Sequence, residues 1–170
     1  MTSEPTKGRA AVLVVSTQAA ADAALDRTGP AIAGWLRERG FTVSEPTIVP
    51  DGGPIAETIT GAVLAGARVV ITTGGTGVTP TDRTPEAVAP LLDLELPGIV
   101  EEIRRRGVVG AGPTALLSRG VAGIAAGGAL VVTLPGSRGG VADGLDVLDG
   151  LLDHVLAQLH GDGHAPRSAS

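Results

Sequence analysis

Residues 69–82 read Val-Val-Ile-Thr-Thr-Gly-Gly-Thr-Gly-Val-Thr-Pro-Thr-Asp, and this stretch decides the fold. Its apolar, β-branched start favours a strand that is buried on both faces. The segment Gly74-Gly75-Thr76-Gly77 follows where this strand ends. Because glycine reaches positive φ and has no side chain, the backbone amides here can form a nest that admits an anion. With Asp82 behind it, the stretch predicts a site for a phosphorylated ligand and its metal, although the same glycines also suit a tight strand-to-helix turn.

The order of buried strand, loop and helix occurs twice in the first half of the chain. Residues 9–16 and 67–73 are continuous apolar runs of strand length, and 9–16 is predicted to be the first, central strand. Helices are predicted over 28–40, with Thr28 as the N-cap, and over 55–64. Two such units in succession favour right-handed crossovers and a largely parallel sheet.

Other segments carry weaker patterns. Residues 17–27 are polar and alanine-rich and predict a loop, whereas 41–49 alternate enough to predict a second strand. Thr84-Pro85-Glu86 predicts the start of a helix, with Thr84 as its cap, that continues to about Asp93. A further helix is predicted over 96–107, with a mixed charged surface.

The C-terminal part predicts a hairpin and a closing helix. Residues 121–125 and 129–134 flank a Gly-Gly turn, so one edge of the sheet should be antiparallel. One apolar stripe predicts a single helix over 141–159. The fold class is therefore α/β, with a mostly parallel sheet, an antiparallel edge hairpin and helices on both faces.

Length and composition limit the function. The 170 residues predict one domain over 9–160, with a flexible N-terminus at 1–8 and a disordered tail at 161–170. The net charge of −5 argues against a non-specific nucleic-acid binder. Without cysteine there is no disulfide, zinc-thiolate site or thiol nucleophile, and the three histidines show no metal or catalytic spacing. No apolar run reaches about 18 residues and no leader is evident, so a cytoplasmic protein without membrane contact is expected.

Four loops follow the predicted strands: 16–18, 50–51, 74–82 and 135–140. In open α/β sheets such loops converge on the ligand crevice. Asp51 and Asp82 would then lie on one rim, where two carboxylates and a polyphosphate suit Mg²⁺. The alternative for each acid is a local turn or helix cap.

Two further loops are candidates. Ser118-Arg119 could place a hydroxyl and a guanidinium on an anionic group, or Arg119 could be an ordinary surface charge. The turn Pro135 to Gly140 could form a second nest with Ser137 as donor, or simply connect a strand to a helix.

Five motifs occur together in one order. They are Thr-Thr-Gly-Gly-Thr-Gly (72–77), Thr-Pro-Thr-Asp-Arg-Thr-Pro-Glu-Ala (79–87), Glu-Leu-Pro-Gly (95–98), Leu-Ser-Arg (117–119) and Leu-Pro-Gly-Ser (134–137). This set resembles the molybdenum cofactor biosynthesis proteins of the Mog and MoaB type, from about Arg9 to Leu159. The resemblance implies a three-layer α/β/α fold, a trimer or hexamer, and molybdopterin adenylyltransferase activity. In that reaction Mg²⁺ and ATP adenylylate the terminal phosphate of molybdopterin and release pyrophosphate, before a separate protein inserts molybdate.

The resemblance also implies roles for individual residues. Asp51 and Asp82 match the two acids needed for adenylyl transfer. The other matched positions are Ser16 after the first strand, the phosphate-side loop Gly74, Gly75, Thr76 and Gly77, the pterin-side hydroxyl Ser118, and the ligand-facing loop Pro135, Gly136 and Ser137.

The chain departs from the family pattern at two positions. Thr17 stands where the family commonly has an acid, and Thr81 stands where it usually has an arginine, with Arg83 nearby. One alternative is therefore a catalytically inactive, MoaB-like protein that binds or carries molybdopterin. Another is a nucleotide-processing enzyme like the related domain of competence-damage proteins, which usually carry an additional domain.

Overall fold

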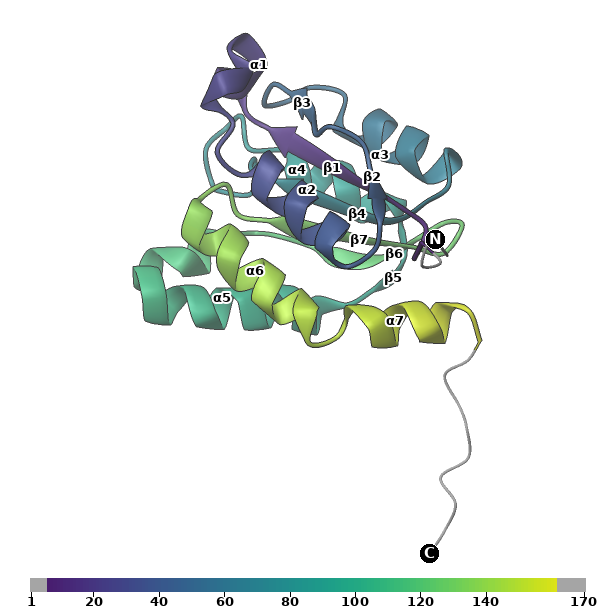
Figure 1. Cartoon of the computed structure of the whole chain (residues 1–170). Coiled ribbons are helices and arrows are strands. Elements are labelled where there is room, and N and C mark those ends of the chain that lie inside the picture. The colour runs from purple at the N-terminus through teal and green to yellow at the C-terminus, as the bar shows by residue number, and fades with distance from the viewer. Residues whose placement is uncertain (1–5, 162–170) are drawn as a thin grey trace, which may run out of the picture.

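The computed structural model describes residues 6–161, and it contains a seven-stranded sheet with helices on both faces (Figure 1). The strands follow the order β2-β1-β4-β7-β6-β5, and β3 also pairs with β1. Their bounds are β1 Arg9–Val15, β2 Thr42–Val43, β3 Thr47–Val49, β4 Ala67–Thr73, β5 Leu92–Glu95, β6 Ala122–Ala125 and β7 Ala129–Leu134. All pairs up to β4–β7 are parallel, whereas β6 is antiparallel to both β7 and β5. The predicted fold class is confirmed.

The helices form two layers, each with its own apolar core. One layer contains α2 (Gly29–Glu38), α5 (Pro97–Ala111), α6 (Arg138–Asp149) and α7 (Leu152–Leu159), and packs on Val69, Ile71 and Val132. The other contains α3 (Ile55–Leu64) and α4 (Thr84–Val88), and packs on Leu13, Val70 and Val131. Alternate residues of β4 therefore enter opposite cores, as a doubly covered strand requires.

The strongest sequence patterns are reproduced. β4 and α3 have the predicted bounds, and the Gly-Gly hairpin joins β6 to β7. β1 ends one residue early, at Val15. The prediction that it is the central strand is wrong, because β1 lies next to the outermost strands β2 and β3, and β4 and β7 are in the middle of the sheet.

The prediction of one strand over 41–49 is wrong. Two short strands, β2 and β3, flank residues 44–46. Pro46 has no amide to donate to a ladder, so the pairing with β1 is interrupted there. The prediction of a loop over 17–27 is also wrong, because α1 (Thr17–Ala21) forms with the Ser16 side chain accepting from the Ala19 amide, and a 3-10 turn, Ala23–Leu25, follows it.

The predicted helix over 84–93 ends at Val88. A 3-10 turn, Ala89–Leu91, contains Pro90, and β5 follows as an edge strand that pairs with β6. The antiparallel edge is thus β5, with the predicted hairpin one place inside it. Thr84 is the first residue of α4 and not its cap. At α2, Thr28 is the N-cap without a side-chain bond, and Asp26 accepts from the Thr28 and Gly29 amides instead.

Two helix ends also differ from the prediction. α5 continues four residues past Gly107. Gly107 packs against Ala115, because a Cβ added at Gly107 would come within 2.9 Å of the alanine methyl. The closing helix divides into α6 and α7 because Gly150 ends the first and Leu151 leaves the helical region.

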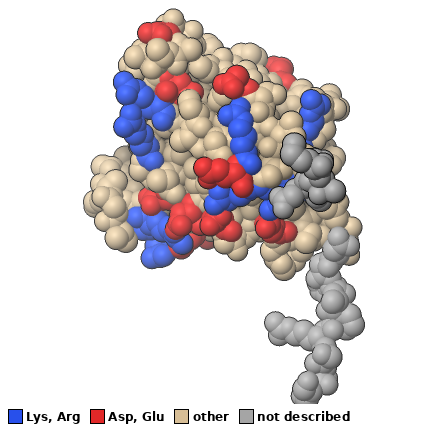
Figure 2. All heavy atoms as spheres, viewed as in Figure 1, with Lys and Arg blue, Asp and Glu red and all other residues tan. Residues whose placement is uncertain are grey.

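Ion pairs on the surface link segments that are distant in sequence. Lys7 pairs with Asp153 at 2.5 Å, Arg39 pairs with Asp149, and a third ion pair links Arg106 of α5 to α6. On the face in Figure 2, cations and acids are interspersed.

The predicted terminal segments fall largely outside residues 6–161. Of the first segment the structure describes residues 6–8, and here the Lys7 amide donates to the Gly40 carbonyl while the Gly8 carbonyl accepts from the Thr42 amide. Of the tail it describes Gly161 alone. No helix among residues 6–161 is both long enough and apolar enough to cross a bilayer.

Candidate functional site

Four loops meet at one edge of the sheet because the strands that lead into them are parallel. β1, β3, β4 and β7 all end at this edge. The Ser16 amide donates to the Val49 carbonyl at 2.9 Å, and the Gly74 amide donates to the Leu134 carbonyl at 3.2 Å. All four loops therefore lie at one edge of the sheet, as predicted, but only 74–82 and 135–140 contribute residues to the cavity found there.

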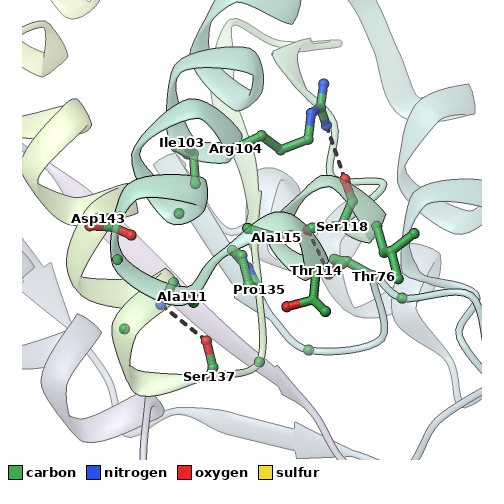
Figure 3. A pocket seen from close by; sticks show the side chains of 18 of the residues that line it. Thr76, Ile103, Arg104, Ala111, Thr114, Ala115, Ser118, Pro135, Ser137 and Asp143 are labelled. Atoms are coloured by element: carbon green, nitrogen blue, oxygen red, sulfur yellow. Dashed lines mark hydrogen bonds between the residues drawn. The ribbon is translucent and has the colours of Figure 1, made fainter.

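A cavity of about 740 Å³ opens at this edge (Figure 3). The glycine-rich loop and the start of α6 line part of it, and α5 with the 3-10 helix η3 (Pro113–Leu117) lines the rest. Among the sequence-predicted residues, the lining includes Gly74 to Gly77, Asp82, Ser118 and Pro135 to Ser137. Ser16 and Asp51 are not part of the lining.

The glycine-rich loop needs glycine at its first two positions. Gly74 and Gly75 have φ values of +90° and +65°. A Cβ at Gly74 would lie 2.2 Å from the Val15 carbonyl oxygen, and one at Gly75 would lie 2.3 Å from the Thr84 hydroxyl. These residues therefore let the loop cross directly over the end of β1.

Of the four backbone amides of this loop, one donates to an acceptor within residues 6–161 and three do not. Gly74 donates to Leu134, so its amide holds the loop on β7. The amides of Gly75, Thr76 and Gly77 have no acceptor within residues 6–161. Three successive donors beside a cavity can bind the oxygens of an anion.

Asp82 lines the cavity and also closes the loop. Its Oδ2 accepts from the Thr79 amide at 3.0 Å and from the Thr79 hydroxyl at 2.6 Å. Asp82 therefore does have the local-turn role. Its carboxylate also lies beside Gly77, where an added Cβ would be 2.8 Å from Oδ2. Because these bonds all use Oδ2, the turn leaves Oδ1 available.

Asp51 is held by Thr17, the first residue of α1. Its Oδ2 accepts from the Thr17 hydroxyl at 2.8 Å and from the Thr17 amide at 3.1 Å. In return, the Asp51 amide donates to the Thr17 hydroxyl at 3.2 Å. The residue that departs from the family pattern thus orients this carboxylate.

Asp51 and Asp82 could each contribute to a Mg²⁺ site only as partial ligands. Within residues 6–161 no group of three or more His, Cys, Asp or Glu residues could hold a metal. Mg²⁺ usually keeps several waters and takes one or two carboxylates together with substrate phosphates. Asp51 and Asp82 each engage the protein through Oδ2, which leaves one oxygen apiece for that arrangement.

The serines of the site have mainly structural partners. Ser16 and Ser137 cap α1 and α6 by accepting from the Ala19 and Gly140 amides. Ser118 shares a hydrogen bond of 3.1 Å with Thr76, which joins η3 to the glycine loop (Figure 3). Gly136 passes close to the same loop, since an added Cβ would lie 3.3 Å from the Gly74 Cα.

Sequence reasoning missed the contribution of α5 and α6. Arg104, predicted to be part of a charged surface, lines the cavity and donates to the Ser118 carbonyl at 3.1 Å. Gly107, Gly110 and Ala111 form the adjoining wall, and Asp143 belongs to the α6 side. The spacing of the small residues on α5 was the available signal, but the helix was predicted to end at Gly107.

Arg119 neither lines the cavity nor stands as a free surface charge. It pairs with Glu86 and donates to two loop carbonyls. The hydrogen bond from Arg119 is the main cause that lowers the pKa of Glu86 below its usual value. Glu86 therefore stays ionised at neutral pH and keeps the guanidinium in place.

The family model described as a probable molybdopterin binding domain matches residues 11–154. The chain belongs to this molybdopterin-binding family. The resemblance to Mog and MoaB proteins is confirmed, and the positions of that resemblance include the cavity wall formed by the glycine loop.

Individual members of the family are similar over most of the chain. The solved Mog protein from Mycobacterium ulcerans is 47% identical with a TM-score of 0.83, covering 89% of this chain and 98% of that one. A molybdopterin adenylyltransferase from Pyrococcus furiosus is 34% identical over 85% of this chain and 87% of its own length. A molybdenum cofactor biosynthesis bifunctional protein from Synechococcus elongatus is 41% identical over 91% of this chain. The chain spans about half of that bifunctional relative, 48% of its length.

Proposed function

We propose that this chain is a molybdopterin adenylyltransferase, which transfers AMP from Mg-ATP to the terminal phosphate of molybdopterin. The observation that carries the proposal is the cavity in which three available amides, Gly75 to Gly77, lie beside the Asp82 carboxylate. Membership of the molybdopterin-binding family and the activity named for the Pyrococcus furiosus relative support the same assignment.

The reaction joins two polyanions. An oxygen of the molybdopterin phosphate attacks the α-phosphorus of ATP, the bond from that phosphorus to the bridging oxygen breaks, and pyrophosphate leaves. The enzyme mainly has to align and neutralise the phosphates, so no histidine is required.

The chain supplies these needs with separate groups. The amides of Gly75, Thr76 and Gly77 would donate to phosphate oxygens, and the small residues of α5 leave room in the cavity for a flat ring system. Asp51 and Asp82 would hold Mg²⁺, which supplies positive charge to the triphosphate. Thr17 keeps the Asp51 carboxylate turned in one direction.

A non-catalytic molybdopterin carrier is the second candidate. It is favoured by one observation, that Asp51 is not among the residues lining the cavity and is bonded to Thr17. A carrier would bind the pterin in the cavity without binding nucleotide.

Replacement of the acids tests the enzyme assignment. In purified protein, Asp82→Asn and Asp51→Asn should each lower pyrophosphate release with molybdopterin and Mg-ATP by about 100-fold or more, because the Mg²⁺ that neutralises the phosphate charge would lose a carboxylate ligand. Asp93→Asn on β5 is the matched control and should keep full activity. Full activity in folded Asp82→Asn and Asp51→Asn proteins would refute the roles of these acids.

Calorimetry separates the two candidates. Titration with molybdopterin alone and then with Mg-ATP should give heat in both experiments for the enzyme. Pterin binding with no nucleotide binding would instead establish the carrier.

A further inference from the structure

Arg119 donates hydrogen bonds to three carbonyls of the segment that begins in the glycine-rich loop and ends at Asp82. Its Nε donates to the Gly77 carbonyl at 2.8 Å, and its Nη2 donates to the Asp82 carbonyl at 3.1 Å. The Arg119 amide adds a bond of 2.8 Å to the Thr76 carbonyl. One residue therefore contacts both ends of the segment 76–82.

Residues 78–81, the middle of this segment, make few hydrogen bonds to the rest of the protein. Val78, Thr79, Pro80 and Thr81 are exposed, and the bonds between Thr79 and Asp82 lie within the segment itself. Hence the distance between the available amides and the Asp82 carboxylate depends on contacts from outside the segment. Arg119 supplies such contacts at Thr76, Gly77 and Asp82.

The guanidinium is suited to this task and is occupied by it. The guanidinium carries its donors on three nitrogens in one rigid plane, so two of them hold two separate carbonyls in fixed positions, whereas all donors of an ammonium radiate from a single nitrogen. Its remaining contact is the ion pair with Glu86 in the first turn of α4. Since three nitrogens have protein acceptors and Arg119 does not line the cavity, it is not placed as a phosphate ligand.

We propose that Arg119 is a positioning residue, which holds the segment 76–82 so that the Asp82 carboxylate and the Gly75 to Gly77 amides keep the spacing that adenylyl transfer requires. The proposal rests on the proposed function for its catalytic consequence. The ordering of the loop by Arg119 is a property of the substrate-free protein and does not depend on the proposed function.

The experiment compares Arg119→Lys with Arg105→Lys. Arg105 on α5 is an arginine that pairs with a carboxylate, Glu102, without touching the loop. Hydrogen–deuterium exchange of the substrate-free proteins should show amides of 76–82 exchanging about 10-fold faster in Arg119→Lys and unchanged in Arg105→Lys. The melting temperature should fall by only a few degrees, because exposed ion pairs contribute little to stability.

Kinetics test the catalytic half. For Arg119→Lys, kcat for pyrophosphate release should fall roughly 10- to 100-fold, because a small misplacement of catalytic groups has that effect. KM for molybdopterin should change by less than about threefold, since α5 and α6 still form the cavity walls. Arg105→Lys should match the wild type in both quantities.

Each result decides the proposal. Unchanged loop exchange in Arg119→Lys, or faster exchange with unchanged kcat, would overturn it, and so would faster exchange spread through the whole chain. If Arg119→Lys does not fold, Glu86→Gln replaces it, and a smaller rise in loop exchange is then required. If wild-type protein releases no pyrophosphate, the proposed function fails while the exchange result still decides whether Arg119 orders the loop.

Discussion

Gly74 shows how one residue determines the shape of the site. Its φ of +90° lies in the region that favours glycine, and the space for a Cβ is taken by the Val15 carbonyl oxygen. The loop passes so close to β1 that the Gly75 to Gly77 amides reach the cavity at the end of the sheet. A side chain at Gly74 would move the loop away from β1 and disturb this arrangement.

Gly74→Ala should lower the free energy of unfolding by about 2 to 4 kcal/mol, because it combines backbone strain with a steric clash. Gly34→Ala is the matched control. Gly34 lies inside α2 at a negative φ with nothing within 4 Å of an added Cβ, so alanine there should stabilise by about 0.5 to 1 kcal/mol. Urea unfolding measures both changes, and equal effects of the two substitutions would contradict this account.

At the level of elements, α5 lines the cavity and also carries the clasp, a cluster of ion pairs formed by Glu102, Arg105 and Arg106. Glu102 accepts from the Nε of Arg105 at 2.7 Å and from the Nε of Arg106 at 2.9 Å. These bonds, that from Arg105 first, lower the pKa of Glu102 to about 2. Arg106 also pairs with Asp146, so the clasp joins α5 to α6.

The sign of the resulting pH dependence follows from the lowered pKa. The clasp stabilises the fold fully above the ordinary pKa of 4.5, and its contribution is lost as the pH falls towards about 2. The difference in urea midpoint between wild type and Glu102→Gln should therefore shrink across this window. Glu101→Gln, the neighbouring substitution on α5, should show no such trend, and a constant difference for Glu102→Gln would contradict the clasp.

The elements also show which sequence patterns are sufficient. β4 and α3 were predicted with their observed bounds because their signals are local, a continuous apolar run and a helix bounded by Pro54 and Gly66. β5 was missed because Leu92 to Glu95 are mostly exposed and acquire their strand conformation by pairing with β6. Such pairing partners are distant in sequence, so propensity alone does not reveal them.

At the scale of the whole molecule, large apolar side chains remain on the surface. Leu64 and Val109 are 83% and 82% exposed, and Leu94 on the edge strand is 61% exposed. Free strand edges and exposed apolar groups favour association between chains. The trimer or hexamer that the family resemblance implies would cover such groups, and it stays a prediction.

Light scattering of the purified protein should give three or six times the chain mass of 16.8 kDa. The oligomer should persist on dilution to micromolar concentration, since exposed apolar surface is removed from water on assembly. A mass equal to one chain at every concentration would contradict this prediction.

The sequence by itself determined the fold class, the family and the position of the glycine-rich loop at the end of a buried strand. Continuous apolar strands, a glycine-rich turn and an ordered set of motifs are local features, and each has only a few compatible structures. The positions of Gly74 to Gly77 and Asp82 in the cavity lining agree with those features.

Only the tertiary structure decided which hydrogen-bond partners the two acids and Arg119 have. The sequence placed Asp51 and Asp82 at one edge, but only the packing of α1 against β3 shows that Thr17 holds Asp51. From the sequence, Arg119 was a candidate to bind an anionic group or an ordinary surface charge, whereas in the structure its nitrogens donate to the Gly77 and Asp82 carbonyls. Hydrogen bonds between segments remote in sequence depend on side-chain directions that are set only when the layers pack, and residue patterns do not specify those directions.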